Sequence, residues 1–121
     1  AEMNKAIATA KKTVTELLAA IKDGVDTYCV KAPITDSNGT EHFWLSKVQY
    51  SDGKFTGSID NDPNTVECVK LGQTYTIKES DISDWLYVRK GKVTGNLTLR
   101  VLFPKMTATE VAEAKKAMGW D

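Results

Sequence analysis

A regular apolar stripe near the start of the chain is the sequence feature that most constrains the fold. Its side chains recur at alternating steps of four and three residues: Met3, Ile7, Ala10, Val14, Leu17 and Ile21. This spacing places them on one face of an α-helix. Asp23-Gly24 follows, and a glycine here favours the end of a helix. The stripe predicts a helix over residues 3–21 that packs on a sheet or, less commonly, on a second copy of itself.

From residue 28 onwards apolar side chains recur at every second position, which predicts β-strands. We expect strands over residues 28–32, 42–50 and 54–59, with Pro33 ending the first. Asp52-Gly53 is a strong signal for a two-residue hairpin turn. Such a turn sets three opposing pairs: Tyr50 with Phe55, Val48 with Gly57, and Ser46 with Ile59.

This register also predicts which side chains share a face of the sheet. It places Trp44, Val48, Tyr50, Phe55 and Ile59 on one face, and Phe43 and Leu45 on the other. Both faces are then apolar near Trp44, so we expect a helix to cover part of the second face.

The second half of the chain predicts more strands and a final helix. Strands are expected over residues 73–78, 85–89 and 92–93, while residues 66–71 are ambiguous. Residues 97–103 fit either a strand or a short helix, and Gly95-Asn96 before them favours the helix. Thr107 and Glu110 have the spacing of a capping box, which predicts a helix over residues 107–118.

These elements predict one α+β domain over residues 1–121. We expect a hairpin-built, strongly bent antiparallel sheet over residues 28–103, a long N-terminal helix over residues 1–23 and a short C-terminal helix. The 16 basic and 16 acidic residues give zero net charge, which argues against nucleic-acid binding. The chain lacks an apolar run long enough for membrane insertion, and it carries no motif for a cofactor.

Two cysteines and the first residues bear on the compartment. Cys29 and Cys68 allow one disulfide bond in an oxidising compartment, or are two separate small apolar side chains. The chain begins with Ala1-Glu2-Met3, which suits a mature form after removal of a signal peptide and also suits a trimmed start. We expect a periplasmic or secreted protein.

Catalytic candidates are few. His42 is the only histidine, and with Glu41 and Asp84 it could carry general acid–base chemistry. A lone histidine on a strand is more often structural, so these three are weak candidates. Asp60, Asp62 and Asn64 have the spacing of the first calcium-loop ligands, but the later ligand positions do not fit, and we expect no metal site.

Aromatic side chains provide the better binding candidates. Trp44, Asp84, Trp85 and Tyr87 combine aromatic surface with a carboxylate, as in many ligand pockets. An ordinary core, in which the indole N–H of Trp85 finds an acceptor, is the more common arrangement of such residues and is the interpretation we prefer.

Six segments within residues 28–103 follow one another in a recognisable order: Val30–Pro33, Glu41–Leu45, Asp52–Gly57, Val69–Gln73, Ile82–Tyr87, and Gly95-Asn96 leading into Thr98–Arg100. In these segments the chain resembles the YegJ-like proteins, a bacterial family of unknown function. The resemblance implies a small bacterial protein, often exported or attached to other domains, and implies no activity. The first and last helices lie outside this stretch.

Together these observations favour a non-enzymatic binding or accessory protein of the bacterial envelope, with a protein or peptide partner. A specific form is an immunity-type or inhibitor protein that neutralises a protein partner. The alternatives are a small hydrolase or transferase using Glu41, His42 and Asp84, and a structural homodimer joined by the first helix. The sequence is compatible with a monomer or a homodimer.

Overall fold

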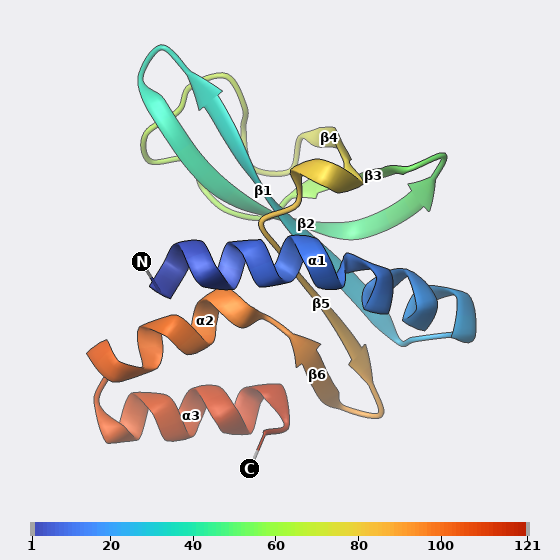
Figure 1. The fold of residues 1–121 in the computed structure, drawn as a ribbon. Helices are drawn as coiled ribbons and strands as arrows, with labels where there is room; N and C mark the ends of the chain where they lie inside the picture. Colours follow the sequence, from blue (N-terminus) through green and yellow to red (C-terminus); the bar gives the residue numbers. More distant parts are fainter. Residues whose placement is uncertain (1, 121) are drawn as a thin grey trace.

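The computed structural model describes residues 2–120 as a six-stranded antiparallel sheet with helices before and after it (Figure 1). The strands are β1 (Thr27–Asp36), β2 (Gly39–Ser51), β3 (Lys54–Ile59), β4 (Thr74–Lys78), β5 (Asp84–Arg89) and β6 (Lys92–Gly95). The helices are α1 (Glu2–Asp23), α2 (Leu97–Leu102) and α3 (Ala108–Met118), with short 3₁₀ helices η1 (Glu79–Asp81) and η2 (Phe103–Lys105). The strand order is β4-β3-β2-β1-β5-β6. The predicted α+β class, with its antiparallel sheet and long first helix, is confirmed.

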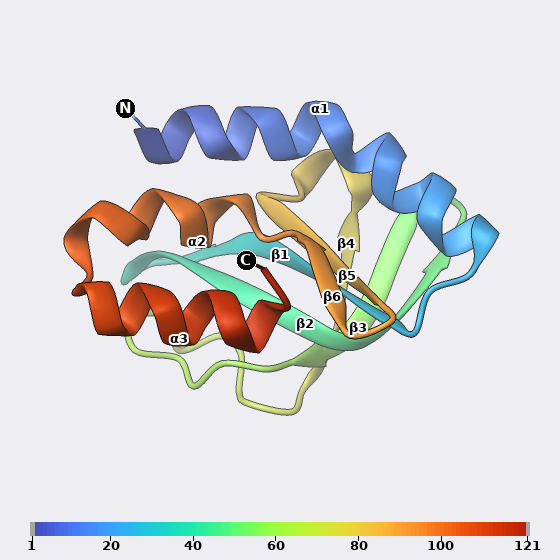
Figure 2. The same cartoon turned by 90° about the horizontal axis from the view of Figure 1, so that it is seen from below.

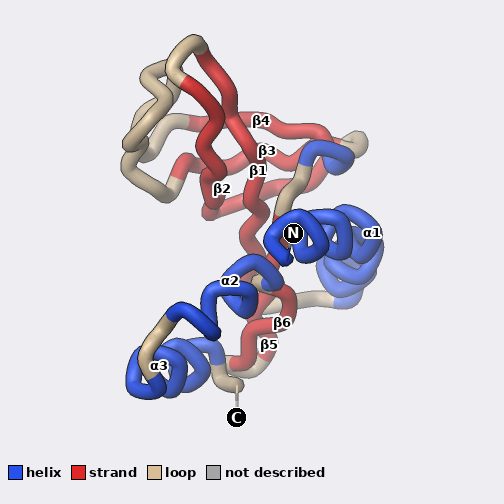
Figure 3. The backbone as a smooth tube through the Cα atoms, turned by 60° about the vertical axis from the view of Figure 1, so that its left-hand side comes forward, coloured by secondary structure: helices blue, strands red, loops and turns tan. Residues whose placement is uncertain are grey.

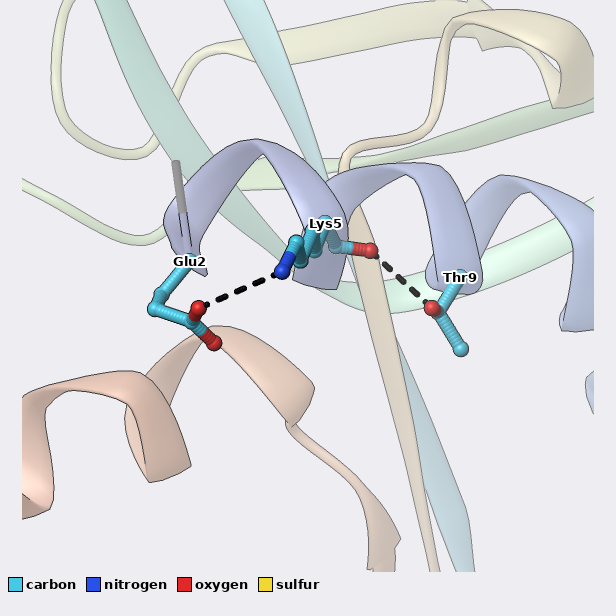
Figure 4. A network of polar contacts seen from close by, with 3 residues as sticks. All are labelled: Glu2, Lys5 and Thr9. Atoms are coloured by element: carbon cyan, nitrogen blue, oxygen red, sulfur yellow. Dashed lines mark hydrogen bonds and ion pairs between the residues drawn. The ribbon is translucent and has the colours of Figure 1, made fainter.

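Helix α1 packs its predicted stripe on the sheet. Ala10, Val14 and Leu17 are buried in one core cluster with strand residues that include Val30 and Phe55. A fully buried leucine such as Leu17 contributes about 1.5–3 kcal/mol through burial. The exposed side of the first turns carries polar contacts instead (Figure 4). The Lys5 ammonium pairs with the Glu2 carboxylate at 3.5 Å, and the Thr9 hydroxyl donates to the backbone carbonyl of Lys5.

The β2–β3 hairpin has the predicted turn but a different register. Asp52 and Gly53 both have positive φ (55° and 75°), and Tyr50 opposes Phe55 as expected. A bulge then interrupts the pairing between Ser46 and Gln49, with Lys47 at φ 51°. Beyond it Ser46 opposes Ser58 and Leu45 opposes Ile59, so the predicted pair Ser46 with Ile59 is wrong. Val48 and the extra residue Lys47 both lie opposite Gly57.

The bulge also corrects the predicted faces. Because one extra residue reverses the alternation, Leu45 and Val48 both enter the core with Phe55. Trp44 instead shares the opposite face with its cross-strand partner Lys31. Gly57 lies opposite the bulge, where an added Cβ would lie 2.7 Å from the carbonyl oxygen of Ser46.

Pro33 does not end β1, contrary to the prediction. The Lys31 carbonyl accepts a bond from the Ser83 amide on the side of β5. By alternation, the ring nitrogen of Pro33 faces the same side, and β5 pairs with β1 only as far as Lys31. The strand therefore continues to Asp36 without losing a hydrogen bond to β2.

The segment between β3 and β4 covers a second part of the core. Residues 60–73 contain no helix or strand, which resolves the ambiguity at residues 66–71. Val66 and Val69 from this segment pack on Ile34, Phe43 and Ile59. The end of the β1–β2 hairpin is thereby covered by a loop instead of a helix.

The C-terminal part confirms the predicted helices. Residues 97–102 are helical, and the capping box of Thr107 and Glu110 begins α3. Figures 2 and 3 show α2 and α3 side by side, with α2 next to the N-terminal half of α1. Beyond α3, Trp120 folds back, with its amide bonded to Lys115 and its ring stacked under the Arg100 guanidinium.

Candidate functional site

The strand pairing separates the four residues predicted to form a binding pocket. Trp85 and Tyr87 face α1, where their rings stack with centroids 6.1 Å apart. The Trp85 indole N–H donates to the Ala10 carbonyl at 3.2 Å, and the side chain is buried. Asp84 and Trp44 lie on the opposite face, so the structure does not bring the four together.

Asp84 is a structural carboxylate. It is fully buried and accepts hydrogen bonds from the backbone amides of Trp85, Leu97 and Thr98 and from the Thr98 hydroxyl at 2.6 Å. Two of these amides begin α2, whose first N–H groups have no partner within the helix. Asp84 thus connects β5 to α2.

Lys31 extends this contact towards the surface. Its ammonium donates to the Thr98 hydroxyl at 3.2 Å and lies 5.5 Å from the centre of the Trp44 ring. Burial lowers the pKa of Lys31, and the negative charge of Asp84 partly offsets that effect. The result is a half-buried cation beside an aromatic face.

Glu41 and Asp36 are also occupied by structural contacts. The Glu41 carboxylate accepts from the amides of Asn64, Thr65 and Val66, at 2.8 Å for Thr65. Asp36 likewise accepts from the amides of Glu67 and Cys68, at 2.7 Å for Glu67. These hydrogen bonds lower the pKa of both carboxyl groups, with the Thr65 amide the largest cause for Glu41 and the Glu67 amide for Asp36. Both side chains hold the loop of residues 60–73 in place.

His42 pairs with a serine that sequence reasoning did not single out. Its Nδ1 lies 2.9 Å from the Ser83 Oγ. Burial lowers the pKa of His42, and the charge of Lys31 lowers it further. A serine beside a neutral histidine resembles part of a nucleophilic site, but Ser83 is only 1% exposed, which hides its hydroxyl from a substrate. Because Glu41 and Asp84 are held elsewhere, the predicted trio does not form an acid–base site.

A groove on the face of Trp44 is the best candidate site, and we call it the Trp44 groove. It has a volume of about 270 Å³ and eight lining residues: Met3, Lys31, Trp44, Asn96, Thr98, Leu99, Leu102 and Met118. Leu102 is 41% exposed, one of two large apolar side chains in residues 2–120 that are this exposed. Of the predicted residues only Trp44 lines it.

The structure also bears on the two cysteines, on possible metal ligands and on possible membrane spans. Cys29 and Cys68 are free thiols, so the disulfide is not formed. Cys29 lies in β1, where it is opposite Leu86 of β5. The amide of Cys68 is bonded to Asp36, at the other end of β1. Within residues 2–120, no group of acidic, histidine or cysteine side chains could hold a metal ion. None of the described helices combines the length and apolar character of a membrane span.

Comparison with known proteins identifies the family. The sequence profile described as "Uncharacterized protein conserved in bacteria (DUF2314)" matches residues 1–121, which includes both terminal helices. The chain belongs to this family. It is 47% identical over 113 residues to the uncharacterized protein YegJ of Escherichia coli K12, covering 90% of this chain and 74% of YegJ.

A second relative is longer. The chain is 31% identical over 106 residues to a putative ankyrin repeat protein of Neisseria meningitidis serogroup B, a match that covers 84% of this chain and 42% of that protein. No solved structure matches the chain.

Proposed function

We propose that this protein is a non-enzymatic binding protein, and that the Trp44 groove receives apolar side chains of a protein partner. The observation that carries the proposal is an apolar groove with a leucine exposed at its edge. Leu102 is 41% exposed and lies beside Trp44, Met3 and Met118. Tryptophan and methionine side chains are enriched at the centre of protein interfaces.

The size and lining of the groove favour a protein partner over a small molecule. Its volume of about 270 Å³ is below the range of about 300–1,000 Å³ that small-molecule pockets occupy. Methionines adapt their shape to different apolar partners, and two of them line this groove. Lys31 adds a cation beside the Trp44 ring, which favours a partner with a carbonyl or carboxylate near its apolar side chain.

The longer relative supports the same class of function. It is named as a putative ankyrin repeat protein, and repeat proteins of this kind generally use extended surfaces to bind partners. A domain that occurs with such repeats suits a role in protein binding. An inhibitor or immunity-type protein that neutralises its partner is the specific form we propose.

A hydrolase or transferase is less well supported. The Ser83–His42 hydrogen bond is the one feature that favours it, and the Ser83 hydroxyl is buried. Glu41 and Asp84 both serve structural roles, which leaves His42 without a carboxylate from the predicted trio. A His42→Ala variant that retains partner binding supports the binding function.

The test uses two exposed leucines as a matched pair. Leu102 lies in the Trp44 groove, whereas Leu71 is 54% exposed in the loop before β4. We expect the native organism to yield one stoichiometric partner that binds the wild type and Leu71→Asp equally. Leu102→Asp should weaken this binding at least about tenfold, because it places a charge where a leucine would be buried. Equal binding by Leu102→Asp at unchanged thermal stability would contradict the proposal.

A further inference from the structure

The sheet has two edge strands, β6 and β4, and among residues 2–120 β6 is covered whereas β4 is not. The indole N–H of Trp120 donates to the Val93 carbonyl on the outer side of β6. Gly119 lies so close to the start of the same strand that an added Cβ would be 2.7 Å from the Gly91 carbonyl oxygen in the β5–β6 turn and 3.1 Å from the Cα of Lys92. Gly119 and Trp120 thus protect β6 from pairing with another strand.

Strand β4 directs unpaired backbone groups outward. The Glu79 amide donates to the Gly53 carbonyl, and the Ile59 amide donates to the Gln73 carbonyl. These bonds place the odd-numbered residues of β4 in the hydrogen-bonded positions opposite β3. Thr74 and Thr76 therefore direct their N–H and carbonyl groups away from the sheet. No hydrogen bond within residues 2–120 uses these backbone groups.

A recess lies beside this open edge. Its volume is about 380 Å³, and it is lined by β4 residues, by Lys11 of α1, by Pro33 of β1 and by Asp81 of η1. The sheet bends so that β4 and η1 lie near α1 (Figure 1). Pro33 has no N–H with which to close the recess by pairing across it.

We propose that the open edge of β4 binds an extended segment of a partner protein, which adds to the sheet as an antiparallel strand. The unpaired groups repeat at every second residue along β4, and this repeat matches an extended polypeptide. Apolar side chains of the segment would enter the recess beside Ile77 and Pro33. The binding surface differs from the Trp44 groove.

The charges on β3 and β4 favour an acidic segment. Lys54 and Lys78 are directly opposite each other, and like charges at such positions repel. Neither lysine forms an ion pair within residues 2–120. An aspartate or glutamate opposite Lys78 would offset this repulsion. If a second copy of β4 paired antiparallel about a two-fold axis at Thr76, Thr74 of one copy would lie opposite Lys78 of the other. That arrangement would leave the lysines without a partner of opposite charge.

The experiment uses a synthetic peptide and two variants of one residue. The capped peptide Glu-Val-Thr-Val-Thr places its glutamate opposite Lys78 when it pairs antiparallel with β4. In the free protein, amide exchange should be fast for Thr76 and slow for Tyr75 and Ile77. Saturating peptide should slow exchange at Thr76 at least about tenfold. Replacing the peptide glutamate with lysine should weaken binding severalfold.

The variants Thr76→Pro and Thr76→Ala separate the backbone from the side chain. Both remove the hydroxyl that bonds Thr56, but only proline removes the outward N–H. We expect Thr76→Ala to bind the peptide and Thr76→Pro, at unchanged melting temperature, to lose it. If the proline variant unfolds, the lysine peptide remains as the independent test.

Three results would overturn the proposal. The first is unchanged exchange at Thr76 with excess peptide. The second is equal binding of the glutamate and lysine peptides. The third is a stable dimer of the wild type that Thr76→Pro dissociates, which would assign the edge to a second copy. Leu102→Asp should leave peptide binding unchanged, so the outcome is independent of the Trp44 groove.

Discussion

Replacing Asp84 should lower the free energy of unfolding by several kcal/mol. Because Asp84 is fully buried, the replacement leaves the exposed surface unchanged. Asp84→Ala leaves the amides of Trp85, Leu97 and Thr98 and the Thr98 hydroxyl without their acceptor. A buried donor without a partner costs about 1–3 kcal/mol, so the loss of these bonds together should be at least about 4 kcal/mol. Asp84→Asn keeps one oxygen and should cost about 2 kcal/mol. For a chain of this length, about 4 kcal/mol corresponds to a melting temperature lower by more than about 10 °C.

Urea unfolding followed by circular dichroism measures this loss, provided that the slope m stays constant. Asp62→Ala is the matched control, because Asp62 is exposed in the loop before β4 and should change stability by less than about 0.5 kcal/mol. A cost for Asp84→Ala below about 1 kcal/mol would refute the structural role. It would also restore Asp84 as a candidate for chemistry.

Three further predictions concern the loop, the bulge and the thiols. The pKa values of Asp36 and Glu41 are lowered in the folded state, so their contribution to stability is present above the ordinary carboxyl pKa of about 4 and is lost as the pH falls through the folded values. Urea unfolding between pH 6 and 3 should show this loss, and an Asp36→Asn, Glu41→Gln double variant with the same pH dependence would contradict it. Gly57→Ala should destabilise the protein by about 1–3 kcal/mol in the same assay, because the added Cβ would clash with the carbonyl oxygen of Ser46 across the bulge. An unchanged free energy of unfolding would mean that the bulge is absent. Without reductant, a thiol reagent should react with both cysteines, and with Cys68 faster than with the half-buried Cys29. The reason is that burial and the charge of Asp60 raise the pKa of the Cys29 thiol. A protein with no reactive thiol would contain the disulfide after all.

Most secondary structure was predictable because it depends on neighbours in the sequence. The stripe of α1, the Asp52-Gly53 turn and the capping box at Thr107 are each set by residues within a few positions. The bulge at Lys47 was not predictable in this way, because a single extra residue in one strand depends on packing against the partner strand. The continuation of β1 through Pro33 depends likewise on where β5 ends.

The candidate site was predicted only in part. Trp44 was found because an aromatic residue on a strand is conspicuous in the sequence. Leu102, Met3 and Met118 were missed, because three separate helices bring them to the groove and no local pattern marks them. The role of Asp84 stayed open because a buried carboxylate that begins a helix looks the same in sequence as one in a pocket. Export to the periplasm or beyond stays a prediction.

Oxidative footprinting of the protein with its captured partner tests the central claim most directly. Methionine and tryptophan side chains react with oxidants according to their exposure. Met3, Met118 and Trp44 line the groove, whereas the half-buried Met106 lies outside it and serves as an internal control. We predict that the partner slows oxidation of the three groove residues and leaves Met106 unchanged. A stoichiometric complex in which the groove residues react as fast as in the free protein would contradict the account.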